Sequence, residues 1–141
     1  MKTGLVSITF RNKTSAEITA LVKKGGLQGI EWGGDVHVPH GDLATAEKVR
    51  KLTLDAGLEV AAYGSYYRAG YSETAEPSIP FAKVLETAIR LGAPTIRVWA
   101  GAKGSAVSTP ADRDAVMEDL RRIGSFAAQE GITISLEYHG G

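Results

Sequence analysis

Short runs of apolar and β-branched residues recur along the chain, and the segments between them are long enough to form helices. Four of these runs follow a glycine, namely Gly26, Gly57, Gly92 or Gly131. Glycine is common just after a helix because it adopts the left-handed conformation without strain. The glycines lie roughly 30 to 40 residues apart, the length of one strand, one helix and two loops. The pattern therefore predicts a repeated strand–helix unit.

Capping residues mark where the predicted helices begin. Thr14 and Glu17 have the spacing of a capping box, and Asp42, Ser78 and Thr109 are side-chain caps in front of the other helices. We therefore predict helices at 14–25, 43–56, 79–91 and 110–130. Strands are predicted at 4–10, 28–33, 58–64, 95–100 and 132–138.

Strands joined by helical crossovers run parallel, which leaves an open doubly wound sheet or a barrel. Periodicity alone does not separate the two, but the composition of the strand faces does. In the last strand Ile134 and Leu136 alternate with Ser135 and Glu137, so one face is apolar and the other polar. A doubly wound sheet is apolar on both faces, whereas a barrel wall faces its own lumen. We predict an α/β fold, a parallel (βα) half-barrel of five strands and four helices.

The chain has 141 residues, with 16 basic and 16 acidic side chains and no cysteine. Its length suits one domain. The balanced charge argues against nucleic acid or an anionic membrane as partners, and no apolar stretch approaches the roughly 20 residues of a membrane helix. The absence of cysteine fits a reducing compartment, so we expect a cytoplasmic protein.

Four phrases in order resemble the N-terminal half of the xylose-isomerase-like TIM barrels: GLVSITF, GLQGIEW with GGDVHVPHGD, LGAPTIRVWAG, and ISLEYHGG. This family includes sugar and sugar phosphate isomerases and epimerases, inosose dehydratase-like enzymes and type IV apurinic endonucleases. A complete barrel has eight strands and roughly 250 residues. Residues 1–141 are thus expected to be the part from the first strand to the fifth, a fragment that is inactive alone.

The resemblance implies that Glu137, which ends the fifth strand, is both a metal ligand and the catalytic carboxylate. The metal would be a divalent ion such as Mn, Mg, Co or Zn in the intact barrel. Its other ligands would come from later strands, so this chain alone is expected to hold no metal. The reaction would move a proton next to a carbonyl of a small sugar or sugar phosphate.

Five further residues are candidates for substrate contact: His37, His40, Tyr66, Trp99 and His139. The first two lie in the loop after the second strand, on the expected active face. The resemblance also leaves open a metal-binding role for both histidines, as in the endonuclease members, and both could equally be surface residues without a role in the site.

Two charges and two aromatic residues are expected to have structural roles. Glu31 and Arg97 would form an ion pair in the lumen, because an unpaired buried charge is costly. Trp32 and Tyr138 have the parity of the helix-facing side and are expected in the core.

A half-barrel would also expose unpaired strand edges and its lumen face. An alternative to a sugar isomerase or epimerase is therefore a non-catalytic half-barrel that self-associates as a homodimer or larger oligomer, or binds a partner through these edges.

Overall fold

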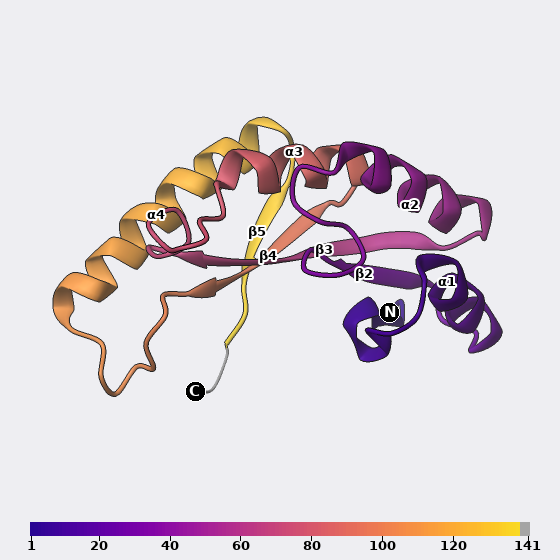
Figure 1. Ribbon diagram of the computed structural model, residues 1–141, viewed down its shortest axis with the longest axis horizontal. Helices are drawn as coiled ribbons and strands as arrows, with labels where there is room; N and C mark the ends of the chain where they lie inside the picture. Colours follow the sequence, from indigo (N-terminus) through magenta and orange to yellow (C-terminus); the bar gives the residue numbers. More distant parts are fainter. Residues whose placement is uncertain (139–141) are drawn as a thin grey trace.

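The computed structural model describes residues 1–138 and shows one sheet of five parallel strands in the order β1, β2, β3, β4, β5. The strands are β1 (Gly4–Val6), β2 (Gly29–Gly33), β3 (Glu59–Ala69), β4 (Thr95–Ala100) and β5 (Thr133–Leu136). The helices are η1 (Ser7–Phe10), α1 (Ser15–Lys24), α2 (Leu43–Asp55), α3 (Phe81–Leu91) and α4 (Pro110–Gln129). Helices α2, α3 and α4 arch over one face of the sheet (Figure 1). This is the predicted parallel (βα) half-barrel.

Within the described part of the chain, no helix combines the length and the apolar character needed to cross a membrane.

The helix boundaries follow from local capping chemistry, as the sequence predicted. Thr14 accepts a hydrogen bond from the Glu17 backbone N–H and its own N–H donates to the Glu17 carboxylate, which completes a capping box. Thr109 and Asp112 repeat the same arrangement at the start of α4. The four glycines predicted after helices all have a positive φ between 69° and 76°.

One predicted cap is wrong. Ser78 does not cap α3, which begins three residues later at Phe81 after Pro80. The first backbone N–H of the helix donates instead to the Glu73 carboxylate at 2.9 Å. Pro80 has a fixed φ and suits the entry to a helix, so a more distant carboxylate takes the place of a local cap.

The predicted first strand, 4–10, is too long. Strand β1 ends at Val6 because the Ser7 hydroxyl turns into the fold, where it accepts the Gly33 backbone N–H at 2.9 Å. The chain continues as the short 3-10 helix η1. The predicted third strand, 58–64, is too short, since β3 continues to Ala69 through a register shift against β4.

The core lies between the sheet and the helices, and its aromatic residues have partners for their polar atoms. Trp32 is buried as predicted and its indole N–H donates to the Thr53 hydroxyl at 3.1 Å. The Tyr63 hydroxyl donates to the Val38 carbonyl at 2.9 Å. Tyr138, predicted in the core, is 94% exposed because no described helix follows β5 to cover it.

The extended end of β3 is held against α4. The Asp119 carboxylate, on α4, accepts the Tyr67 hydroxyl and the Gly70 backbone N–H, each at 2.8 Å. It also pairs with Arg122 at 2.7 Å. Because Tyr67 is fully buried, this network fixes the chain on both sides of Arg68.

Candidate functional site

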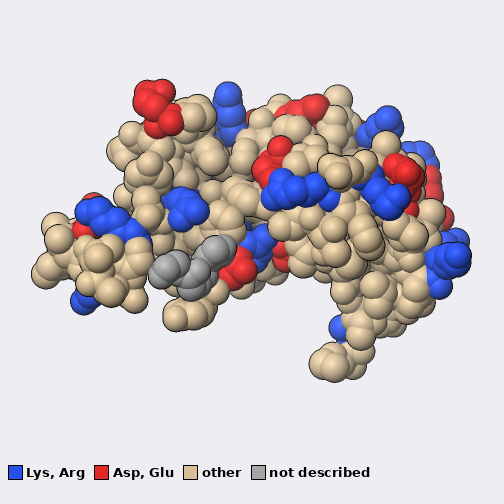
Figure 2. Space-filling model, turned by 60° about the horizontal axis from the view of Figure 1, so that its bottom comes forward, with Lys and Arg blue, Asp and Glu red and all other residues tan. Residues whose placement is uncertain are grey.

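An acid–arginine–acid cluster occupies the open face of the sheet. The Arg97 side chain, from β4, donates through Nε to the Glu31 carboxylate of β2 at 2.7 Å. Its Nη1 donates to the Glu137 carboxylate, which follows β5. The predicted ion pair of Glu31 and Arg97 is confirmed and extended by a second carboxylate. Figure 2 shows acidic and basic side chains close together in the hollow of this face.

Gly64 of β3 makes room for this cluster. A Cβ atom at this position would lie 2.7 Å from both Arg97 Nη2 and Glu31 Oε1. Real Cβ atoms do not approach other heavy atoms so closely, and both neighbours belong to a tight ion pair. The missing side chain therefore lets the guanidinium bridge the sheet from β4 to β2.

The cluster is largely removed from water on its inner side. The side chains of Arg97 and Glu31 are 15% and 17% exposed, whereas that of Glu137 is 38% exposed. Burial acts to lower the pKa of Arg97, but hydrogen bonds and charges from Glu31 and Glu137 outweigh it, and the pKa is raised. The guanidinium therefore stays cationic, and Glu137 is the more accessible of the two carboxylates.

Aromatic residues flank the accessible carboxylate. The Trp99 indole N–H donates to the Glu137 carboxylate at 2.5 Å. The Tyr66 ring meets Trp99 edge to face, with centroids 5.0 Å apart. The Tyr66 hydroxyl accepts Arg11 Nη2 at 2.8 Å, and Arg11 in turn pairs with Asp35. Of the predicted substrate-contact residues, Trp99 thus contacts the predicted catalytic residue Glu137 directly, and Tyr66 contacts Trp99.

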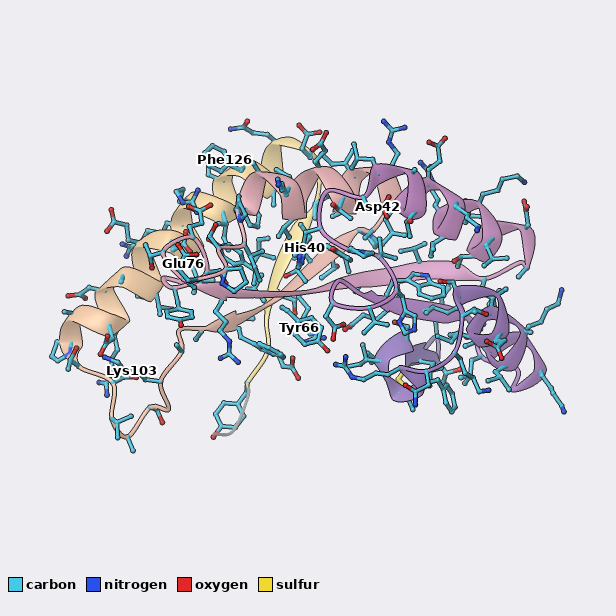
Figure 3. The ribbon with its side chains drawn as sticks, in the orientation of Figure 1. His40, Asp42, Tyr66, Glu76, Lys103 and Phe126 are labelled. Carbon is cyan, nitrogen blue, oxygen red and sulfur yellow. The ribbon has the colours of Figure 1, made fainter. Side chains whose placement is uncertain are left out.

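Tyr66 lies within β3 rather than on the loop after it, and its backbone is unusual. Its φ of +58° is in the left-handed region, which costs a residue with a side chain free energy. The position coincides with the register shift between β3 and β4. The shift directs the Tyr66 ring to the open face below β3 in Figure 3. Burial is the main cause that raises the pKa of its hydroxyl, which therefore stays protonated at neutral pH.

The two described histidines hold the loop after β2. His37 is only 6% exposed, with Nε2 donating to the Lys13 carbonyl and Nδ1 facing the Ser7 hydroxyl at 3.0 Å. His40 donates through Nε2 to the Ser65 carbonyl at 2.6 Å. In these interactions neither histidine contacts Glu137 or Trp99, and the predicted contact of His37 and His40 with substrate stays a prediction. His139 lies outside the described residues.

We expect His40 to make stability depend on pH. Burial lowers the pKa of His40, so between that value and the ordinary value of about 6.5 the unfolded chain binds the proton more tightly. The free energy of unfolding should therefore decrease as pH falls through this window. Denaturant titrations at about pH 7.5 and about pH 5.5 measure this. His40→Gln should remove this contribution, and an unchanged pH dependence in the variant would contradict it.

The described residues do not form a metal site. Within residues 1–138 no group of three or more His, Asp or Glu side chains is placed to hold a metal ion. The Glu137 carboxylate already accepts hydrogen bonds from Arg97 and Trp99. Catalytic metals in proteins usually have three or more protein ligands. The predicted role of Glu137 as a ligand therefore requires residues that this part of the chain does not supply.

Three contributors to the site were not predicted from the sequence: Gly64, the pair of Arg11 and Asp35, and Arg68. Arg68 lies over the Trp99 ring at 4.8 Å from its centroid. The available signal was the aromatic run YGSYYRA, which continues the strand pattern past 64 and brings Arg68 to the site.

The parallel half-barrel, with the charged and aromatic cluster on its open face, has the architecture of part of a TIM barrel. Residues 19–141 match the family described as xylose isomerase-like TIM barrel, and the chain belongs to this family. A comparison with curated proteins finds no match.

Solved structures resemble the chain over 94% to 100% of its length. The probable 3-DHS dehydratase AsbF of Bacillus anthracis is 26% identical with a TM-score of 0.80, and the match covers 100% of this chain and 53% of that one. The 3-keto-D-glucoside 4-epimerase YcjR of E. coli is 21% identical with a TM-score of 0.70, and the match covers 96% of this chain and 55% of that one. A xylose isomerase domain protein of Salmonella typhimurium is 18% identical with a TM-score of 0.70, covering 94% and 47%. The chain thus spans about half the length of these structures.

Proposed function

We propose that this chain supplies the first half of the active site of an enzyme that moves a proton next to a carbonyl in a small sugar or sugar phosphate. Glu137 is the carboxylate that takes and returns the proton. Arg97 orients it, and Trp99 and Tyr66 form one wall of the substrate site. If a divalent metal takes part, its ligands besides Glu137 would come from outside residues 1–138, within which no group of three or more potential metal ligands lies together.

The observation that carries this proposal is the position of Glu137. It follows β5 at the carboxyl edge of the sheet, is the most exposed member of the charged cluster, and has an aromatic wall beside it. A general base must be accessible to substrate and held in a fixed orientation, and both conditions are met. The names of two similar structures support the chemistry. One is named a probable 3-DHS dehydratase and the other a 3-keto-D-glucoside 4-epimerase, and in the second name the epimerised position 4 is adjacent to the keto group at position 3.

Hydrogen exchange with solvent tests the proposed reaction. The endogenous gene product that contains this chain is isolated, its intact mass is measured, and it is incubated in D₂O with a panel of ketoses and keto-glycosides. We expect deuterium to enter the carbon next to the carbonyl, as detected by proton NMR of the sugars. No exchange and no conversion of any panel member, by a protein shown to be folded, would contradict the proposal.

A second function, self-association, is favoured by the exposed last strand. Three of the four residues of β5 are exposed. Leu136 is 50% exposed although it lies on the apolar face of the strand. An exposed edge strand with an apolar side chain tends to pair with another strand. Two copies that pair along β5 would form a homodimer.

Sedimentation velocity tests self-association directly. We expect the 141-residue chain to sediment as a dimer that dissociates on dilution. Leu136→Lys should weaken the dimer at least tenfold, because a lysine at a strand edge disfavours pairing. Leu54→Lys on α2, also half exposed, is the matched control and should leave the dimer unchanged. A monomer at all concentrations, or equal effects of both variants, would contradict the dimer.

A further inference from the structure

Arg68 differs from the other two arginines of the site in its partners. Arg11 is paired with Asp35, and Arg97 with both Glu31 and Glu137. Within residues 1–138, Arg68 forms no ion pair. Its guanidinium donates through Nη1 to the Gly101 carbonyl at 3.2 Å and stacks on Trp99. Since a guanidinium has five N–H donors, most of the hydrogen-bonding capacity of Arg68 is left for a ligand.

The backbone of Arg68 is fixed in place. Arg68 is in register with Trp99 on the neighbouring strand, so both side chains emerge side by side. Its backbone N–H donates to the buried Ser72 hydroxyl at 2.7 Å, and its carbonyl accepts the Ser72 N–H at 2.9 Å. The neighbouring Tyr67 is anchored on Asp119. The guanidinium is therefore presented by a rigid strand end, as a preorganised binding group should be.

Trp99 contacts charged groups of both signs. Its indole N–H faces the Glu137 carboxylate, whose cluster with Arg97 and Glu31 has one more negative than positive charge. Its ring carries the Arg68 guanidinium. A substrate that lies along Trp99 would place a neutral polyol segment toward Glu137 and an anionic group toward Arg68. The reverse orientation would put two negative charges together.

We propose that Arg68 and Trp99 form a subsite for an anionic terminal group, a carboxylate or a phosphate, of the sugar-like substrate. This inference rests on the proposed function, whose substrate it narrows to sugar acids or sugar phosphates. Arginine suits both groups because its planar fork donates two parallel hydrogen bonds to either.

NMR titration of the ¹⁵N-labelled 141-residue chain tests this subsite without requiring turnover. Glycerol, glycerate and glycerol 1-phosphate are added separately at matched ionic strength, and the Trp99 indole and Arg68 Nε signals are followed. We expect saturable shifts with glycerate, glycerol phosphate or both, and none with glycerol. A response to glycerate alone indicates a sugar acid, and a response to the phosphate alone indicates a sugar phosphate. Equal shifts with glycerol, or no saturable shift with either anion, would overturn the subsite.

Variants separate a binding role from a structural one. Arg68→Gln should weaken binding of the responding anion at least tenfold, as expected for loss of a charge-assisted hydrogen bond. Arg121→Gln, at an exposed position of α4, should leave it within about twofold. Unchanged affinity in folded Arg68→Gln would overturn the proposal. If Arg68→Gln does not fold, the affinity of Arg68→Lys for the same anion is measured instead. An unchanged affinity in Arg68→Lys would overturn the proposed role of the guanidinium. Anion binding that persists in a protein without proton exchange would contradict the proposed function and leave this subsite standing.

Discussion

Replacing Glu137 with glutamine lowers the rate of proton exchange next to the substrate carbonyl by a factor of about 10² to 10⁴, the usual contribution of one positioned acid–base group. Glutamine keeps the shape of the side chain, and its amide oxygen still accepts the hydrogen bonds of Arg97 and Trp99. It cannot take up a proton at neutral pH. The loss should therefore fall on kcat more than on KM, measured by deuterium incorporation in the endogenous gene product.

Glu130→Gln is the matched control for this prediction. Glu130 is an exposed carboxylate at the end of α4, and the same substitution there should change the exchange rate less than about twofold. An exchange rate that survives in Glu137→Gln would exclude this carboxylate as the base.

Replacing Arg97 with methionine lowers the free energy of unfolding by about 3 kcal/mol, the lower end of the range for breaking a buried ion pair. Methionine fills a similar volume, so the loss is mainly electrostatic. Glu31, whose side chain is only 17% exposed, would lose its partner and face the Glu137 carboxylate across the same space. Urea denaturation at one fixed protein concentration measures the difference, so that any self-association is held constant.

The control for Arg97 is Arg90 on α3, which forms an ion pair with Glu47 of α2. Both of these side chains are exposed, and exposed ion pairs contribute about 1 kcal/mol or less. Arg90→Met should therefore change stability only slightly. Equal losses for Arg90→Met and Arg97→Met would show that the cluster on the open face is not a stabilising ion network.

The repeated strand–helix order was predictable because its signals are local. A glycine after each helix, and a capping residue before three of the four helices, act within a few positions of the chain. Gly26, Gly57 and the Thr14 capping box are all as predicted. The pairing of Glu31 with Arg97 was predictable too, since two charges of the same parity in a lumen must compensate each other.

The missed features depend on contacts between distant segments. The extension of β3 to Ala69 depends on its register shift against β4, which no local pattern of the third strand encodes. The start of α3 depends on Glu73, eight residues before the N–H that it accepts. Whether Tyr138 is buried depends on whether another element covers it, and the alternation of residues along the strand does not predict that.

The close approach at Gly64 means that residues 31, 64, 97 and 137 constrain one another during evolution. A side chain at 64 is excluded while the guanidinium at 97 bridges to Glu31, and the guanidinium is needed while carboxylates stand at 31 and 137. Substitutions at these sites should therefore be non-additive, each harmful alone and tolerated only in combination. In evolutionary terms the four residues form one epistatic unit. A descendant of this protein could acquire a larger residue at position 64 only together with replacement of the arginine and of the carboxylates that it neutralises.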